Sequence, residues 1–405
     1  MKGAEYLKKK LNYKRNRVLL RYEFYEQKKK APDLGISTPE GLEWFSSING
    51  WCTKAVDNLA DRLQFDGFDN DIFNFKDMFD QNNPDIFFDD SILSALISAC
   101  AFVLITKGED DKSVRFQVID GSNATGVIDD YTKLLTEGYA VLERDLDHPD
   151  TVIRYAYCTP GRTEVYEHDK LVAVEAFSSK YCALVPIIYK PDAKRLFGHS
   201  RISRACMDYA KSAMRTVKRM EISSEFYSFP QKYATGLSQD AEELDKWQAT
   251  MSAMLTFTKD EEGDSPTLGQ FQVGSMSPHV EQLKAIASMF AGETGLTLDD
   301  LGFITSNPSS AEAIKAGHEG SRLAASKAQR SFSVGFKNVG YIGACIRDEF
   351  EYVREAVFET KVLWKPTFEP DAAMLSSIGD GVYKLNEAIP NFVDEARMRR
   401  LTGIE

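Results

Sequence analysis

Apolar residues follow a helical period through much of the first hundred residues. The pattern predicts a long, highly charged helix over residues 1–30, which the segment APDLG is expected to end. Residues 38–65 place apolar side chains at helical spacing behind Thr38 as the N-cap and Pro39 at the first helical position. The apolar run at 91–106 predicts a buried helix, because it is shorter than the roughly 20 residues that a membrane-spanning helix needs.

Between residues 101 and 190 the pattern changes to short runs of β-branched and aromatic residues separated by turns. Because no helical segments alternate with these runs, we expect an antiparallel β region rather than a parallel sheet. The runs are VRFQVID, GYAVLERD, TVIRYAYCTP, TEVYEHDK, LVAVEAF and ALVPIIYK.

The second half of the chain returns to helical spacing. A helix is expected from Gly198 to about residue 228, followed by a compact insert with strand QKYATGL, helix SQDAEELDKWQATMSAM and strands LTFTKDE and TLGQFQV. A second helix begins at Ser277. After the loop GETGLTLDDLGFITSNP, a long third helix is expected over 309–350, and its glycines permit a kink. A strand, VLWKPTF, and a helical segment at 371–405 complete an α+β fold.

Composition and charge are typical of a folded globular protein. Of the 405 residues, 43% are hydrophobic and 27% are charged, and the formal net charge is −12. The first 30 residues nevertheless hold eleven Lys and Arg against three Glu, so the remainder is strongly acidic. Such a body would repel phosphates over most of its surface, which argues against a general nucleic-acid-coating role.

The six cysteines are scattered and form no C-x-x-C pair, which indicates reduced thiols in a cytosolic compartment. The opening segment MKGAEYLKKK lacks the apolar core of a signal peptide. We therefore expect a soluble cytoplasmic protein.

The sequence carries none of the usual enzyme signatures, such as a phosphate-binding loop, a dinucleotide-binding glycine motif or a nucleophile elbow. No histidine has a second His or Cys three or four residues away. The Asp-rich run at 66–80 lacks the acid that completes a calcium-binding loop, and the pairs Asp129–Asp130 and Asp299–Asp300 have no base or nucleophile beside them. We expect no enzyme, and therefore no catalytic residue, no metal site and no cofactor.

The stretch from Lys194 to Arg219 is strongly basic within this acidic chain. It holds eight Lys and Arg and a single acid, Asp208. Four of the basic residues fall at spacings that form one stripe on a helix, namely Arg204, Lys211, Arg215 and Lys218. The opposite face is apolar, with Ile202, Cys206, Tyr209, Ala213, Val217 and Met220. The pattern alone is equally consistent with a solvated face and with a contact to nucleic acid or to another subunit.

The order of segments around this helix resembles that of bacteriophage portal proteins, specifically the SPP1-type portal family of tailed phages and prophages. Three ordered stretches that cover about a third of the chain carry the resemblance, whereas 1–190 and 370–405 fit more loosely. The three are RLFGHSRISRACMDYAKSAMRTVKRMEISSEFYSFPQKYATG, LTFTKDEEGDSPTLGQFQVGSMSPHVEQLKAIASMFAGETGLTLDDLGF and NPSSAEAIKAGHEGSRLAASKA.

The resemblance implies a portal-protein fold that assembles into a ring: a mainly helical wing with a β region, a two-helix stem, a small α+β clip and a short helical crown. A tunnel loop is expected to face DNA through Thr297, Leu298, Asp299, Asp300, Leu301 and Phe303. The implied segments are the N-terminal wing 1–198, stem helix 199–228, clip 229–276, stem helix 277–292, tunnel loop 293–308, second wing part 309–370 and crown-like segment 371–405.

The resemblance also implies a function. About twelve subunits would form a ring at one capsid vertex, through which double-stranded DNA is packaged and ejected without sequence specificity. The implied partners are further copies of the chain, the terminase large subunit, head-completion or tail adaptor proteins, and the major capsid and scaffolding proteins, with no membrane. The expected location is the virion, after assembly in the host bacterial cytoplasm, and the ATPase activity belongs to the terminase.

Two other interpretations stay open from the sequence. One is a non-enzymatic DNA-binding module built on the basic helix, which would bind DNA as a monomer with steep salt dependence. The other is a component of a DNA-processing complex such as a terminase or nuclease. The missing phosphate loops and carboxylate–metal spacing argue against the latter.

Overall fold

The computed structural model describes residues 2–31, 38, 42, 44–108, 113–228, 232–235, 267–270, 274–303, 316–367 and 372–402. The chain divides into two compact units, and each is described by itself. Unit 1 consists of Met1–Lys28, Gly50–Met207 and Ala291–Glu405, and unit 2 consists of Lys29–Asn49 and Asp208–Phe290.

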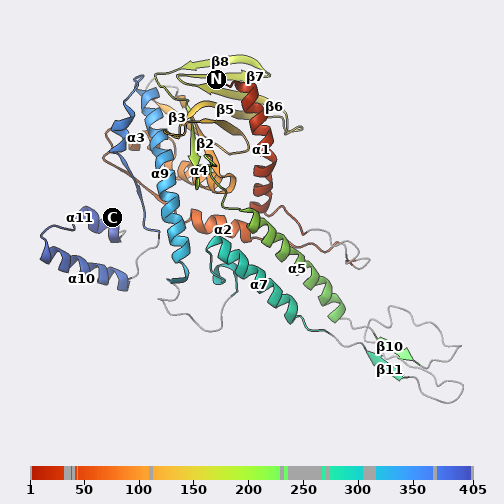
Figure 1. Cartoon of the computed structure of the whole chain (residues 1–405). Helices are drawn as coiled ribbons and strands as arrows, with labels where there is room; N and C mark the ends of the chain where they lie inside the picture. The colour runs from red at the N-terminus through yellow and green to blue at the C-terminus, as the bar shows by residue number, and fades with distance from the viewer. Residues whose placement is uncertain are drawn as a thin grey trace, which may run out of the picture. The chain divides into compact units, whose positions relative to one another are not determined.

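The two larger antiparallel sheets of unit 1 form its core (Figure 1). The smaller has the order β3-β2-β9 and the larger the order β4-β5-β6-β7-β8, and every pairing is antiparallel, which confirms the predicted β region. Buried side chains of both sheets share one core, among them Phe102, Leu135 and Leu184. The strands are β2 (Cys100–Lys107), β3 (Val114–Ile119), β4 (Ala124–Ile128), β5 (Leu135–Arg144), β6 (Val152–Thr159), β7 (Arg162–Glu167), β8 (Lys170–Ala176) and β9 (Leu184–Ile188).

The basic N-terminal helix α1 (Ala4–Tyr25) packs on the larger sheet. Its Leu7 and Leu11 are buried against Tyr139 and Val141 of β5. The helix is shorter than the predicted stretch 1–30, because the chain leaves it after Tyr25 and Gln27 takes a positive φ of 58°. Helix α1 also protects the edge strand β4, since lysines of α1 donate hydrogen bonds to its free carbonyls.

The apolar run at 91–106 is not a single helix, so that prediction was wrong. Helix α4 (Pro84–Ser98) ends at Ala99, which takes a left-handed conformation with φ 85° and donates its N–H to Ala95 O. The chain then continues as β2, the central strand of the smaller sheet. A fully buried strand is apolar on both faces and therefore has the same pattern as a buried helix.

The prediction of one helix through 38–65 was also wrong. Helix α2 (Trp51–Ala60) begins only after Gly50, residues 45–50 are not helical, and residues 39–41 and 43 lie outside the described residues. Ser47 instead belongs to unit 2, where its hydroxyl donates to the carbonyl of Met214 at 2.6 Å and its own carbonyl accepts from the N–H of Ala31 at 3.1 Å. These bonds hold the segment away from a helical path.

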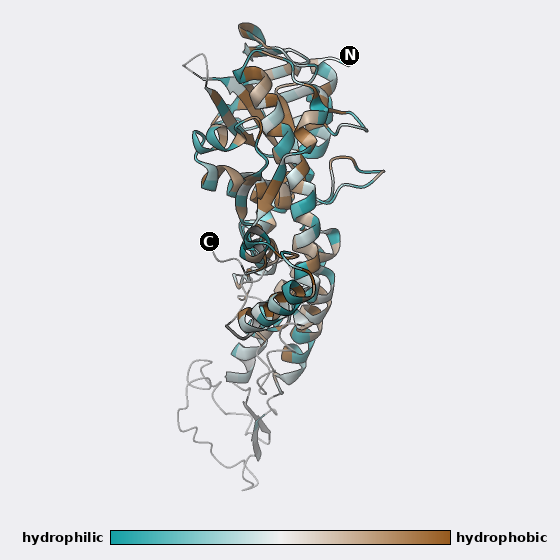
Figure 2. Cartoon of the chain, turned by 90° about the vertical axis from the view of Figure 1, so that its left-hand side faces the viewer, coloured by the Kyte–Doolittle hydropathy of each residue, from teal (hydrophilic) through white to brown (hydrophobic). Residues whose placement is uncertain are grey.

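The Asp- and Phe-rich segment forms an aromatic core with helix α9 (Glu319–Arg347). The ring of Phe88 stacks on Phe65 with centroids 3.7 Å apart and meets Phe336 of α9 edge-on at 4.7 Å. Figure 2 shows hydrophobic residues gathered in the sheets and helices of this unit. Around this aromatic core, strand β1 (Phe65–Asp69) pairs antiparallel with β12 (Lys361–Trp364). Helix α3 (Phe75–Asp80) and the 3-10 helix η3 (Arg354–Phe358) also belong to unit 1.

The long third helix differs from its predicted extent of 309–350. Residues 304–315, and with them the proposed capping serines, lie outside the described residues. A turn at His318 precedes α9, which ends at Arg347. The described residues 372–402 form two helices, α10 (Ala372–Ala388) and α11 (Glu395–Thr402). Among the described residues, no helix is both long enough and apolar enough to cross a bilayer.

Most of the described residues of unit 2 belong to two helices, α5 (Arg204–Ser228) and α7 (Ser277–Thr294), whose residues 204–207 and 291–294 belong to unit 1. Within unit 2 the Ser223 hydroxyl of α5 lies 3.4 Å from Nε2 of His279 on α7. Between them in sequence, β10 (Lys232–Thr235) pairs antiparallel with β11 (Thr267–Gln270). The predicted helix SQDAEELDKWQATMSAM and strand LTFTKDE lie outside the described residues.

Helix α5 begins at Arg204 and not directly after Gly198, because the intervening residues bond to other elements of unit 1. The N–H of His199 donates to Tyr189 O at 3.0 Å, and the N–H of Arg201 donates to Leu96 O at 2.8 Å. The Ser200 hydroxyl donates to Ile97 O at 2.6 Å. These bonds hold the entry to α5 against the end of β9 and the end of α4.

We predict that Gly198→Ala lowers the free energy of unfolding by about 3 kcal/mol. Gly198 has a φ of +74°, and an added Cβ would lie only 2.0 Å from the carbonyl oxygen of Tyr189. Gly302→Ala is the matched control, because Gly302 has a φ of +89° with open space around it. It should cost about 1 kcal/mol in urea unfolding, and equal losses at both sites would contradict the close-approach argument.

Candidate functional site

The structure does not place the four predicted basic residues of α5 on one solvent-exposed stripe. Arg204 and Arg215 are exposed and Lys211 is half-buried, whereas Lys218 is only 5% exposed. The buried side of the helix includes Ala210, Ala213, Met214 and Ile222. The predicted apolar face is therefore displaced, since Tyr209, Val217 and Met220 are only partly buried.

Arg215 lies beside a groove of about 390 Å³ between α5 and α7 in unit 2. The α5 side carries Arg215 and Arg219 together with Asp208, and the α7 side carries Ile286 and Met289. The Arg215 guanidinium donates to the Ser212 hydroxyl at 3.1 Å. One acid and two arginines leave this groove with a local positive charge.

Arg204 belongs to a different site, which lies wholly in unit 1. It borders a cavity of about 590 Å³ together with Arg17 and Arg21 of α1 and with Arg195. Sequence reasoning missed this cluster, because α1 and the start of α5 are far apart in the chain and only the tertiary fold brings them together. The one available signal was the excess of basic residues in both stretches.

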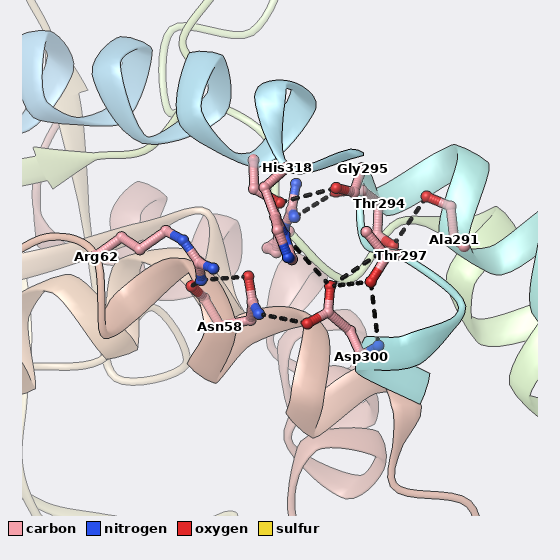
Figure 3. A network of polar contacts seen from close by, with 10 residues as sticks. Asn58, Arg62, Ala291, Thr294, Gly295, Thr297, Asp300 and His318 are labelled. Atoms are coloured by element: carbon pink, nitrogen blue, oxygen red, sulfur yellow. Dashed lines mark hydrogen bonds and ion pairs between the residues drawn. The ribbon is translucent and has the colours of Figure 1, made fainter. Parts of the chain in front are cut away.

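The start of the predicted tunnel loop is a tightly bonded turn (Figure 3). After α7, residues Asp299–Leu301 form the short 3-10 helix η2. Oδ2 of Asp300 accepts hydrogen bonds from the N–H and from the hydroxyl of Thr297, both at 2.9 Å. The Thr297 hydroxyl is in turn 3.1 Å from the N–H of Asp300, so the two residues cap each other.

This turn is anchored to α2 and to the start of α9. The Asn58 amide donates to Oδ1 of Asp300 at 3.4 Å, and Arg62 donates to Oδ1 of Asn58 at 2.6 Å. Nδ1 of His318 lies 3.9 Å from Oδ2 of Asp300, and the Ser321 hydroxyl donates to Gly295 O at 2.8 Å. Sequence reasoning missed Asn58, Arg62 and His318, which have no local signal. For the turn itself a signal exists, because the T-x-x-D spacing of Thr297 and Asp300 is typical of a capping turn.

The predicted loop residues therefore differ in their surroundings. Asp300 is largely buried and engaged, whereas Asp299 beside it is exposed. Leu301 and Leu298 are half-buried, and the ring of Phe303 meets that of Trp51 edge-on with centroids 6.4 Å apart. Residues 304–308 of the predicted loop lie outside the described residues.

Within the described part of the chain, no group of three or more His, Cys, Asp or Glu is arranged to hold a metal ion. All six cysteines are free and buried. Burial raises the pKa of the Cys206 thiol at the start of α5, which keeps this thiol protonated and unreactive at neutral pH.

Among curated proteins, two phage proteins are similar in sequence to this chain. No protein-family model matches the chain. It is 23% identical over 323 residues to a portal protein of Mycobacterium phage D29 and 22% identical over 323 residues to a portal protein of Mycobacterium phage L5. Each match covers 72% of this chain and 64% of the relative, so the chain spans about two thirds of the length of these curated relatives.

Among solved structures, the chain is similar to one in the virion of a native gene transfer agent particle, with a TM-score of 0.48 and 12% identity. It is also similar to a chain in the neck of the native particle, with a TM-score of 0.46 and 13% identity. Both similarities cover 88% of this chain and 90% of the other.

We predict that Asp300→Ala loosens the turn and lowers the free energy of unfolding by about 2 kcal/mol, because it leaves the Thr297 N–H without its acceptor. Amide hydrogen exchange at residues 297–303 should become faster. Asp299→Ala is the matched control, since this neighbouring carboxylate is exposed. Unchanged exchange in the Asp300 variant would show that the turn does not depend on this carboxylate.

Proposed function

We infer that this chain, a homologue of phage portal proteins, is the subunit of a portal ring through which double-stranded DNA enters and leaves a virion. The observation that carries the inference is the similarity to two phage portal proteins over 323 residues. Because the chain spans only part of those relatives, its activity and its partners are part of this proposal.

The proposed roles follow the segments that the sequence resemblance implies. Helices α5 and α7 act as the stem within 199–228 and 277–292, and the strand pair β10–β11 belongs to a clip at 229–276. The wing comprises 1–198 and 309–370, most of which belongs to unit 1, and α10 and α11 lie in the crown-like segment 371–405. The Asp300 turn fixes the root of the tunnel loop 293–308 on α2 and α9.

The charge of the chain suits a conduit for DNA. A protein that neutralises many phosphates with Lys and Arg binds DNA tightly and holds it in place. A net charge of −12 keeps most of the surface free of such contacts, so the duplex can slide. In this proposal the ring hydrolyses nothing itself, and it docks the terminase large subunit, then head-completion or tail adaptor proteins, within a shell of capsid and scaffolding proteins.

A second candidate is a DNA-binding module that acts as a monomer. The observation that favours it is the groove lined by Arg215 and Arg219, where two arginines outnumber the single acid, Asp208. The two candidates differ in oligomeric state, because a module needs only one copy to bind.

Negative-stain microscopy and mass photometry of the purified chain test the proposal. The chain has a mass of 45.5 kDa, so a ring of about twelve copies should have a mass of about 550 kDa and a central hole. A chain that stays monomeric at high micromolar concentration, and that binds DNA with steep salt dependence, would contradict the portal proposal and support the module.

We predict that the double variant Lys211→Glu and Arg215→Glu impairs ring assembly or DNA packaging. The two substitutions reverse two positive charges on the proposed stem helix. Neither residue is fully buried, so the far-ultraviolet circular dichroism and the melting temperature should stay nearly unchanged. A matched control is the pair Arg154→Glu and Lys170→Glu, on exposed positions of β6 and β8 respectively. Normal phage yield from the Lys211 and Arg215 variant would remove the proposed role of these charges.

A further inference from the structure

Unit 1 contains a cavity that is lined by arginines. Arg17 and Arg21 come from α1, Arg195 precedes α5, and Arg204 is the first residue of α5. Lys14 lies at the same cavity, where its Nζ donates to Ala124 O at 2.9 Å and burial lowers its pKa to about 8. The described residues that line this cavity of about 590 Å³ include no Asp and no Glu.

The positive charges of this cavity repel one another. The pKa of Arg21 is lowered by burial and then by the charges of Arg17, Arg195 and Arg204. Nε of Arg21 is buried and has no hydrogen-bond partner among the described residues. A half-buried guanidinium with like-charged neighbours is costly in an isolated chain, and an anion that enters the cavity would remove that cost.

A second cavity of unit 1, of about 660 Å³, has the opposite charge. Five aspartates line this cavity, and Lys365 is the one positively charged residue among its described lining residues. Burial raises the pKa of Asp89, and the charges of Asp85, Asp90 and Asp61 raise it further. The aspartates are Asp57 and Asp61 of α2 and Asp85, Asp89 and Asp90 of α4.

The outer face of α4, at the border of this cavity, carries three aspartates and an isoleucine. Asp85, Asp89 and Asp90 are exposed there, and Ile86 in the same turn is 64% exposed. The arginine-lined cavity offers matching chemistry, because Leu20, Phe197 and Met207 line it together with the arginines. An acidic helix face with one apolar side chain therefore fits a basic cavity with apolar walls.

We propose that the α4 face of one copy of this chain, formed by Asp85, Ile86, Asp89 and Asp90, docks into the arginine-lined cavity of the next copy. The proposal rests on the ring proposed above and names its subunit interface. A contact between two different patches of the same chain is heterologous, and such contacts repeat around a closed ring. This contact would pair the arginine cluster with the aspartate cluster, and in the isolated chain the like charges within each cluster repel one another.

The same cavity suits duplex DNA less well. A duplex is convex and reaches exposed side chains such as Arg17 and Arg204, whereas Nε of Arg21 is buried in the cavity. A short acidic helix turn with an apolar side chain can enter a space of this size. DNA as the occupant is therefore an alternative outcome of the test.

Charge reversal of both partners tests the interface. Arg17→Glu with Arg204→Glu reverses the cavity, and Asp89→Lys with Asp90→Lys reverses the α4 face. All four side chains are exposed, so each variant should fold with an unchanged melting temperature. Each variant alone should lose rings by about tenfold or more at a fixed concentration.

An equimolar mixture of the two variants should recover the rings. In an alternating ring, the reversed cavity of one variant meets the reversed α4 face of the other, and the two native surfaces meet at the next interface. The matched controls are Arg154→Glu and Asp147→Lys, which lie on exposed positions away from both cavities and should keep rings at the level of the unaltered chain. If a double variant does not fold, the single variants Arg204→Glu and Asp89→Lys replace it.

The outcomes separate the two proposals. If the unaltered chain forms no ring, the proposed portal function is contradicted. If the unaltered chain forms rings and the reversed variants do so equally well, the interface is contradicted while the portal function stands. If the cavity variant keeps its rings but loses affinity for DNA, the cavity binds DNA. If both variants lose their rings and the mixture does not recover them, the two surfaces do not contact each other.

Discussion

The apolar core shared by the two antiparallel sheets of unit 1 is the constraint on which the other elements depend. Phe102 and Leu184 of the smaller sheet and Leu135 of the larger sheet are completely buried in it. Such dense packing allows little rearrangement, so elements attached to these strands inherit fixed positions. After β9 the chain reaches Gly198 and the entry to α5 through residues 189–197, and β2 begins two residues after the end of α4.

This core explains why both charged cavities lie in unit 1. Helix α1 packs on the larger sheet through Leu7 and Leu11, and this contact carries Arg17 and Arg21 to the entry of α5. Helix α4 buries Phe88 and Ile92 and leaves its aspartates exposed. Burial of apolar surface stabilises the fold by roughly 25 cal/mol per Å², which outweighs the repulsion within two small charge clusters. Stability of the single chain and complementarity between copies can therefore be separate properties.

The antiparallel β region and most helices were predictable because their patterns are local. Periodicity could not distinguish the strand Cys100–Lys107 from a continuation of α4, since the last turns of α4 and the strand are both predominantly apolar. It also could not show that Ser47 bonds to Met214, because that contact joins distant parts of the sequence.

The candidate site was predictable to a smaller degree. The basic character of residues 194–219 was visible, but the burial of Lys218 and the grouping of Arg204 with Arg17 and Arg21 depend on tertiary packing. The capping pair Thr297 and Asp300 has a sequence signal, whereas its anchors Asn58 and His318 have none. The pairing that we propose between the arginine-lined cavity and the α4 face is invisible to periodicity, because in that proposal the two surfaces lie on different copies of the chain.

The most direct test of the central claim is a cryo-electron microscopy reconstruction of the purified full chain. The account predicts a closed ring with a central channel, in which the carboxylates of Asp89 or Asp90 lie within about 4 Å of the guanidinium groups of Arg17 or Arg204 in the next subunit. A particle without cyclic symmetry, or a compact single chain, would contradict the account.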